Sequence, residues 1–280
     1  MIAAPPTPFI LFGCGHRRKF VCAARGLIEW PGGAVVQEFA PQTLAIDAPA
    51  CSATAADHAG RPIRIVEDEA GLWLDCDGRK QLLTGGNVKL PTFDGHPHAP
   101  ALRALHHEIL VNIVDGRPLP NLLVYRKPWL RDSAMMAMVL QRTGNLQLLR
   151  DWVLSLADPY DRNNAGHPEP DNLGQVLHLI SLVSDASHPL VPVVLREARR
   201  ITADRHLTGR SDFAEHSVYQ TKWLKFGLAR LGLPDEWLVP PVEDSYGPLF
   251  WWDREAIVAG GKRHHAQAHH YPYLTWAEAH

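Results

Sequence analysis

The sequence predicts a mainly α-helical protein built of helical hairpins, with a small β-rich segment at its N-terminus. Three observations support this fold class. Gly, Pro and β-branched residues are concentrated before residue 95, whereas apolar residues at helical spacing dominate afterwards. Helices that are apolar on every face alternate with helices that have one polar face. The hydrophobic content of 46% over 280 residues is enough to bury a core, which excludes a disordered chain.

Residues 1–95 are expected to form the β-rich segment. Its strand candidates are rich in β-branched residues or end near a turn signal such as Asp77-Gly78. They cover residues 34–39, 61–66 and 71–75, with two shorter candidates at 82–83 and 88–90. This pattern is typical of a meander that lies on a larger body.

Residues 96–280 are expected to form an α/α helical-hairpin domain. Apolar residues recur at helical spacing over 99–114, 132–141, 145–156, 172–183, 188–201 and 217–231, and more weakly over 246–258 and 273–280. The segments 132–141 and 172–183 are apolar nearly all round, and an amphipathic segment follows each of them. Two concentric layers of hairpins would produce this alternation, and so would an irregular bundle around two central helices.

The composition also limits the kinds of partner that the chain can bind. The chain has 28 Lys and Arg against 30 Asp and Glu, so no general basic surface exists to hold a nucleic acid. No apolar run reaches the roughly 18–20 residues of a membrane span, and no secretory signal is evident. The four cysteines contain no CxxC pair, which favours reduced thiols and a cytoplasmic location. The sequence leaves the oligomeric state open.

The first candidate site lies at the start of the apolar segment 132–141. Arg131 and Asp132 stand there, two and three residues after Trp129. One interpretation is purely structural: Asp132 caps the helix and has no further role. As a binding site, the charged pair would hydrogen-bond vicinal hydroxyls, which need both donors and acceptors, while Trp129 stacks on the face of a sugar ring. The pattern therefore indicates a polyol ligand.

Two more clusters place acids before helices. Glu169 and Asp171 end a long polar connection just before the second apolar segment, and Glu243 and Asp244 precede the aromatic residues Tyr246, Trp251 and Trp252. Helix capping or core packing could explain each cluster separately. A calcium loop is excluded because the DxDxDG spacing is absent. In a ring of hairpins, loops that enter adjacent inner helices converge, so the three clusters should line one cavity.

The segment Trp129-Leu-Arg-Asp-Ser-Ala resembles the W-x-R-D-[AST]-A segment of glucoamylase-like members of the six-hairpin (α/α-toroid) glycosidase superfamily, over roughly residues 100–280. The resemblance implies that Arg131 and Asp132 bind the sugar at the cleavage subsite. It also implies an inverting carboxylate pair, for which we expect Glu169 as acid and Glu243 as base, with Asp171 and Asp244 as the other catalytic candidates. A full toroid has twelve helices, more than the pattern predicts, so the ring is incomplete, the chain stops short of its end or some helices escape detection.

The expected function is that of a glycoside hydrolase or related carbohydrate-active enzyme with a small carbohydrate substrate and no cofactor. The alternative is a non-catalytic helical protein that binds a sugar or a protein partner through an aromatic-lined cleft. A third, metal-dependent interpretation rests on His265 and His269, which share a helix face if this segment is helical. No third ligand can be named, so the sequence favours a solvated loop there and no metal.

Overall fold

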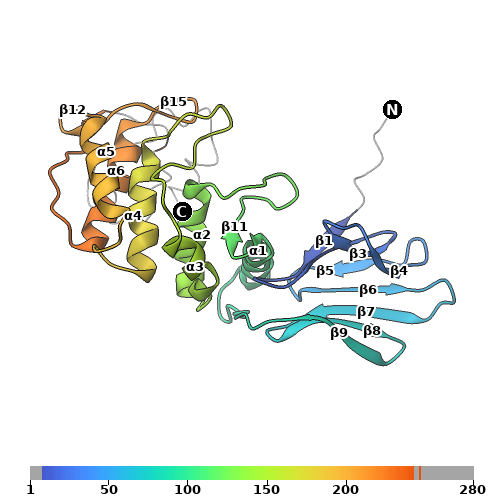
Figure 1. The fold of residues 1–280 in the computed structure, drawn as a ribbon. Helices are drawn as coiled ribbons and strands as arrows, with labels where there is room; N and C mark the ends of the chain where they lie inside the picture. Colours follow the sequence, from blue (N-terminus) through green and yellow to red (C-terminus); the bar gives the residue numbers. More distant parts are fainter. Residues whose placement is uncertain (1–7, 243–245, 247–280) are drawn as a thin grey trace. The chain divides into compact units, whose positions relative to one another are not determined.

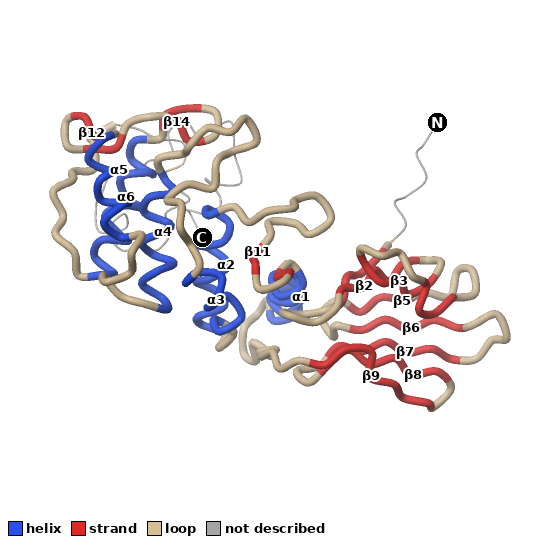
Figure 2. The backbone as a smooth tube through the Cα atoms, viewed as in Figure 1, coloured by secondary structure: helices blue, strands red, loops and turns tan. Residues whose placement is uncertain are grey.

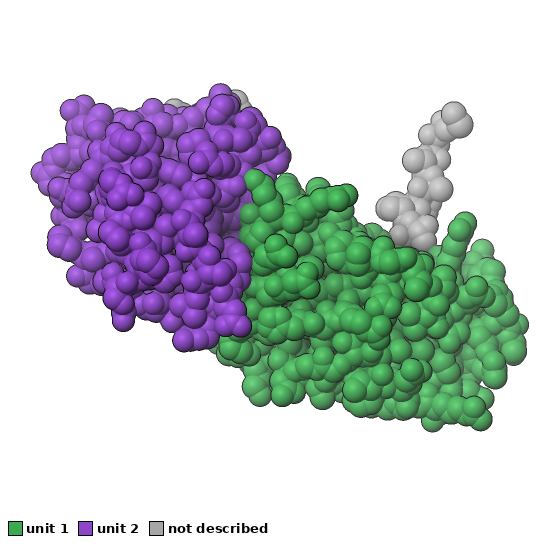
Figure 3. All heavy atoms as spheres, viewed as in Figure 1, with its two compact units in different colours: residues 1–128, 138–149 green, residues 129–137, 150–280 purple. Residues whose placement is uncertain are grey.

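The computed structural model describes residues 8–242 and residue 246, and the chain folds into two compact units. Unit 1 comprises Met1–Pro128 and Met138–Leu149, and unit 2 comprises Trp129–Ala137 and Arg150–His280 (Figure 3). Helices make up 31% of the structure and strands 24%. The expected mainly α class is therefore wrong, because strands contribute nearly as much of the fold as helices.

Unit 1 contains two larger antiparallel sheets in which each strand pairs with the next in sequence (Figure 1). The strands of the first sheet are β1 (Phe9–Phe12), β2 (Lys19–Ala23), β3 (Gly26–Trp30) and β4 (Val35–Glu38). Those of the second are β5 (Ala45–Asp47), β6 (Ser52–Ala56), β7 (Pro62–Glu67), β8 (Gly71–Cys76) and β9 (Arg79–Gly85). Asp77 and Gly78 both have positive φ, 52° and 80°, as a tight two-residue hairpin turn between β8 and β9 requires.

The two sheets share one hydrophobic core. In β7, Ile63 and Ile65 are buried whereas Arg64 is exposed, which is the alternation of a strand with one face inward. The same core includes Ile10, Phe12, Phe20, Cys22 and Leu27 from the first sheet and Ala53, Leu72 and Leu74 from the second. The β-rich part thus has a hydrophobic interior of its own. For this reason it is a folded body in itself and not a small segment on a helical body.

Helix α1 (Ala99–Val111) follows the sheets and ends earlier than predicted. Asp115 and Gly116, with φ of 50° and 73°, turn the chain into a short hairpin of β10 (Ile113–Val114) and β11 (Arg117–Pro118). Helix α2 (Leu130–Arg142) comes next, and its residues up to Ala137 belong to unit 2. The segment Met138–Leu149, which contains the 3-10 helix η1 (Leu146–Leu149), completes unit 1.

Unit 2 is built around α4 (Asp171–Val183), whose first ten residues are all buried, as its apolar pattern predicts. It packs against α3 (Arg150–Leu154), α5 (Val191–Arg200) and α6 (Ser217–Leu231) (Figure 2). Two hairpins lie between α5 and α6: β12 (Thr202–Ala203) with β13 (His206–Leu207), and β14 (Arg210–Ser211) with β15 (Ala214–Glu215). Gly174 and Gly227 let α4 and α6 approach closely, since a Cβ on Gly174 would lie 2.0 Å from the carbonyl carbon of Trp223.

The expected α/α toroid, complete or incomplete, is wrong. Six α-helices occur in the described residues, and the predicted hairpin partner at 145–156 breaks into η1 and the five-residue α3. The remaining predicted helices, 246–258 and 273–280, lie outside the described residues apart from residue 246. No helix in the part of the chain that the structure describes is long and apolar enough to cross a bilayer.

Candidate functional site

Arg131, on the first turn of α2, bridges two buried carboxylates of unit 2. Its Nε donates to Asp171 Oδ2 at 2.8 Å, and its Nη2 donates to Glu169 Oε2 at 2.8 Å. The side chain of Arg131 is 16% exposed, against 5% for Glu169 and 0% for Asp171. We call Arg131, Asp132, Glu169 and Asp171 the Arg131 cluster. The structure thus brings together one basic and two acidic residues that the sequence singled out.

Asp171 is fixed from several sides. Ser211 Oγ donates to its Oδ1 at 2.9 Å, and Gln175 Nε2 donates to its Oδ2 at 2.8 Å beside Arg131. Since a buried carboxylate is stable only when its oxygens are well satisfied, these bonds compensate the burial of Asp171. Asp171 therefore holds the guanidinium of Arg131 in one orientation, and its own side chain is fixed by these contacts.

Glu169 is likewise surrounded by hydrogen-bond donors. Its Oε1 accepts the backbone N–H of Asp212 at 2.9 Å and Asn163 Nδ2 at 3.2 Å, while its Oε2 accepts Arg131. Each of these contacts satisfies a carboxylate oxygen and restricts the orientation of the Glu169 side chain. The arrangement suits a residue that accepts hydrogen bonds and positions Arg131.

Asp132 is in a different environment from its acidic neighbours. Burial raises the pKa of Asp132 above its usual value, and the negative charge of Asp171 adds to this effect, whereas Arg131 opposes it. The cluster therefore combines two ion-paired carboxylates with one carboxyl group that is shifted toward its protonated form. When the environments of neighbouring carboxyl groups differ in this way, one group can act as an acid and the other as a base.

The guanidinium of Arg131 retains binding capacity. Arginine has five N–H donors in a planar fork, and the contacts above use two of them. Among the described residues, no acceptor is recorded for the other three. Two carboxylates thus hold an arginine whose remaining donors are preorganised for an oxygen-bearing ligand.

The predicted aromatic residues Tyr246 and Trp129 differ in their burial and in their contacts. Tyr246 is 7% exposed, stacks on His216 at 3.9 Å between ring centroids, and donates from its hydroxyl to Asp212. Arg131 lies over the Tyr246 ring at 5.6 Å. Tyr246 therefore packs beside the cluster and leaves little ring surface for a sugar. Trp129 is partly buried at the start of α2, where its carbonyl accepts the amide and hydroxyl of Ser133.

The remaining predicted site residues, Glu243, Asp244, Trp251 and Trp252, lie outside the described residues, as do His265 and His269. Four residues that the sequence analysis missed join the site: Asn163, Gln175 and Ser211 through their side chains, and Asp212 through its backbone N–H. Gln175 stands four residues after Asp171, so helical spacing could have identified it. Ser211 and Asp212 come from the β14–β15 hairpin, and no local pattern connects them to α4.

Unit 1 contains a second buried cluster of Cys14, Glu67 and His107, whose potential metal-ligand atoms lie within 4.8 Å of one another. Glu67 nevertheless accepts the backbone N–H groups of Gly13 and Cys14 together with His107 Nε2 and Arg17 Nη1, the latter two at 2.9 Å. The carboxylate oxygens are thus occupied by donors.

The groups around Glu67 already compensate its charge. Burial alone would raise the pKa of Glu67, but the hydrogen bond and charge of His107, the Cys14 amide and Arg17 together lower it to about 2. Burial raises the pKa of the Cys14 thiol, which keeps the sulfur protonated and a poor ligand. This cluster is best explained as a structural link between the end of β1, the end of β7 and α1.

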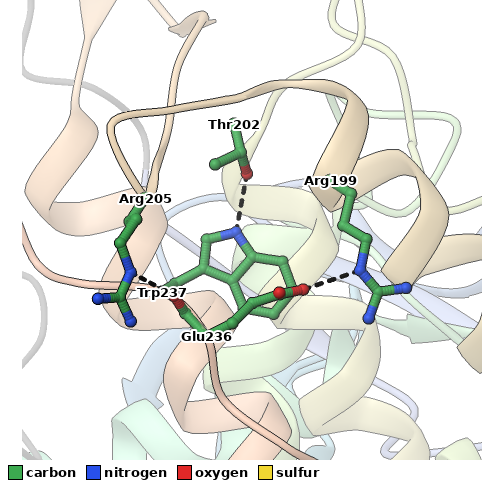
Figure 4. Close-up of a pocket in the computed structure, with 5 residues that line it drawn as sticks. All are labelled: Arg199, Thr202, Arg205, Glu236 and Trp237. Carbon is green, nitrogen blue, oxygen red and sulfur yellow. Dashed lines mark hydrogen bonds and ion pairs between the residues drawn. The ribbon is translucent and has the colours of Figure 1, made fainter.

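A pocket of about 420 Å³ in unit 2 is lined by Arg199, Thr202, Arg205, Glu236 and Trp237 (Figure 4). Arg199 Nε pairs with Glu236 at 2.8 Å, and Trp237 Nε1 donates to Thr202 Oγ1 at 2.8 Å. Figure 4 shows the indole between the two arginines, but Trp237 is only 2% exposed. Since these groups largely satisfy one another, the pocket is a weaker candidate than the Arg131 cluster.

No family model matches the chain, and neither the curated proteins nor the solved structures contain a significant match. The expected membership of the six-hairpin glycosidase superfamily is contradicted by the mixed fold and finds no support in these comparisons. The roles carried over from that family, including its inverting mechanism, lose their basis with it.

Proposed function

We propose that unit 2 binds a neutral carbohydrate at the Arg131 cluster. The observation that carries this proposal is the guanidinium of Arg131, held by Glu169 and Asp171 with three N–H donors left over. The oxygen of a sugar hydroxyl can accept from these donors, and its proton can be donated to a carboxyl oxygen of Asp132. A polyol can accept hydrogen bonds from Arg131 and donate one to Asp132 at the same time.

The charge of the cluster supports a neutral ligand over an anionic one. Arg131 contributes one positive charge, whereas Glu169 and Asp171 contribute two negative charges in a largely buried setting. A phosphate or carboxylate would therefore meet net repulsion that water screens only weakly. A sugar hydroxyl avoids this cost and still forms charge-assisted hydrogen bonds.

A second candidate function is acid catalysis on the bound carbohydrate, and the raised pKa of Asp132 favours it. Cleavage of a glycosidic bond needs one carboxyl group that donates a proton and one that remains ionised. Asp132 suits the first role, and Glu169, which is ion-paired with Arg131, is our candidate for the second. Such a carbohydrate-active enzyme would differ from the expected mechanism, in which Glu169 donates the proton.

The test is calorimetric titration of the full chain with a panel of neutral mono- and disaccharides. Arg131→Lys keeps the charge that Glu169 and Asp171 require but removes the fork, so we expect at least about tenfold weaker binding with the fold retained. The matched control is Arg200→Ala, which removes an exposed arginine paired with Glu197 and should leave affinity unchanged.

The outcomes separate binding from catalysis. Absence of binding to every neutral saccharide, or equal affinity of the Arg131→Lys protein, would contradict the carbohydrate site. Release of reducing sugar that disappears in Asp132→Asn, with binding retained, would establish the catalytic candidate. Binding without such release would leave a carbohydrate-binding protein.

We also propose a cytoplasmic setting for this function. Its support is the set of four cysteines, Cys14, Cys22, Cys51 and Cys76, all of which are free thiols in the structure. Thiol counting in urea, with and without reductant, on protein from the cell of origin would test it, because denaturation exposes the three buried cysteines and an oxidising compartment would leave fewer than four reactive thiols.

A further inference from the structure

A second pocket, of about 430 Å³, lies within unit 1. Its walls come from the end of β3, the β10–β11 hairpin and the loop that follows this hairpin. The lining residues that matter here are Trp30, Asp115, Arg117, Leu122, Tyr125 and Arg126. The volume is in the usual range for small-molecule sites, which begins at roughly 300 Å³.

The wall of this pocket is held in place by a buried asparagine. Asn112, only 5% exposed, accepts the backbone N–H of Leu122 on its Oδ1 at 2.7 Å, and its backbone carbonyl accepts the N–H of Leu119 at 2.9 Å. Asn121 accepts the N–H groups of Leu123 and Tyr125 in the same loop. A pocket with a fixed wall costs little ordering entropy when a ligand binds.

The charges of this pocket are unequal. Arg117 and Arg126 are exposed, and no ion pair is recorded for either of them within the described part of the chain. Asp115, in the hairpin turn, is the one acid among the lining residues. The pocket therefore presents an excess of positive charge and guanidinium donors, the opposite of the Arg131 cluster in unit 2.

The other lining groups indicate what the uncharged part of the ligand is. Buried Leu122 and the half-buried rings of Trp30 and Tyr125 provide apolar surface. Apolar C–H faces of sugar rings stack on such aromatic surfaces, while Asp115 can accept from hydroxyl groups. A simple inorganic anion would use the arginines but none of this surface.

We propose that the pocket of unit 1 binds a carboxylate-bearing saccharide, such as a uronic acid unit. Arg117 and Arg126 bind the carboxylate, Asp115 accepts hydroxyl protons, and Trp30 contacts the ring. This site is independent of the Arg131 cluster, because all of its lining residues belong to unit 1.

The experiment titrates the full chain carrying Arg131→Lys, in which the proposed neutral-sugar site of unit 2 is weakened, with digalacturonate, with neutral galactobiose and with inorganic phosphate. We expect digalacturonate to bind at least about tenfold more tightly than galactobiose at low salt, since a charge-assisted arginine contact is lost in the neutral sugar. Arg117→Ala and Arg126→Ala should each weaken digalacturonate binding by about tenfold, and Trp30→Leu should weaken it without changing the dependence on salt.

The matched control is Arg25→Ala, because Arg25 is an exposed arginine of unit 1 outside this pocket. It should bind digalacturonate as the unmodified chain does. Equal affinity for both disaccharides, displacement of digalacturonate by phosphate at equal concentration, or insensitivity to Arg117→Ala and Arg126→Ala would overturn the proposal. Arg131→Lys should leave digalacturonate binding intact, so failure at one site is distinguishable from failure at the other.

Discussion

At the scale of single residues, environment decides what each charged group does. Glu67, Glu169 and Asp171 are buried carboxylates surrounded by donors, whereas Asp132 is partly buried beside another acid and is shifted toward its neutral form. Composition alone cannot distinguish these states, because all four are acids near hydrophobic segments. The distinction comes from the donors that surround each oxygen.

Replacing Glu67 with Gln should strongly destabilise the protein. The change leaves the buried guanidinium of Arg17 without its ion partner and presents an amide N–H₂ to backbone donors. We expect a loss of about 3–5 kcal/mol in the free energy of unfolding of unit 1, measured by urea denaturation.

The control is Glu29→Gln, which removes the exposed partner of Arg18 and should cost about 1 kcal/mol or less. Similar losses for the two variants would show that the Glu67 interactions are as weak as a surface ion pair.

At the scale of secondary-structure elements, close helix packing organises unit 2. A Cβ on Gly227 would lie 2.6 Å from Leu177 Cβ and 2.7 Å from the Gly174 carbonyl oxygen. Close approach of α4 and α6 therefore depends on glycine at both positions. It also contributes to the position of Asp171 on the first turn of α4, and in this way packing supports the candidate site.

Gly174→Ala should consequently destabilise unit 2, although alanine normally favours a helix. The new methyl group would lie 2.0 Å from a backbone carbon of Trp223, so α4 and α6 must separate. We expect a cost of at least about 1–3 kcal/mol in thermal or urea unfolding.

Gly32→Ala provides the comparison, because nothing lies within 4 Å of a Cβ at Gly32 and its φ is outside the left-handed region. This change should be neutral or slightly stabilising. A neutral effect of Gly174→Ala as well would show that the two helices can move apart without cost.

At the scale of the whole molecule, each unit contains a buried histidine that resists protonation. Burial lowers the pKa of His106 in unit 1 and of His178 in unit 2 to about 4 in each case. His178 also contacts the rings of Trp223 and Phe226, and neither of its ring nitrogens has a hydrogen-bond partner among the described residues. Both units should therefore be sensitive to acid.

Stability should fall as pH decreases from about 6.5 to about 4. In this window the unfolded histidines bind protons that the folded ones do not, so the contribution is complete above the unfolded pKa and is lost below it. Each histidine can account for up to about 3 kcal/mol. Urea unfolding at pH 7.5, 6 and 5 would measure the slope. His178→Leu should reduce it, whereas His167→Gln, at an exposed histidine, should not.

An unchanged slope in His178→Leu would assign the acid sensitivity to other groups. Glu67 contributes separately and at lower pH. Its lowered pKa of about 2 stabilises the fold above the unfolded value, and this stability is lost only as pH falls from roughly 4.5 toward 2.

Local periodicity alone was enough to locate many elements of this chain. The bounds of α6 match the predicted segment 217–231, α4 differs by one residue, and the strands at 61–66 and 71–75 were recognisable from branched residues and the Asp77-Gly78 turn. The same local information placed Arg131, Glu169 and Asp171 at the entrances of helices. These features depend on residues a few positions apart, which is the range that a sequence pattern encodes.

Only the tertiary structure decided how these elements combine. Two sheets share a core across Phe12 and Leu72, and α4 contacts α6 through glycines, so the helices do not form the expected ring. The contacts that distinguish Asp132 from Asp171 come from residues as distant as Ser211, forty positions along the chain. Packing and desolvation depend on groups brought together by the whole fold, and for that physical reason a local pattern indicated the site but not its chemistry.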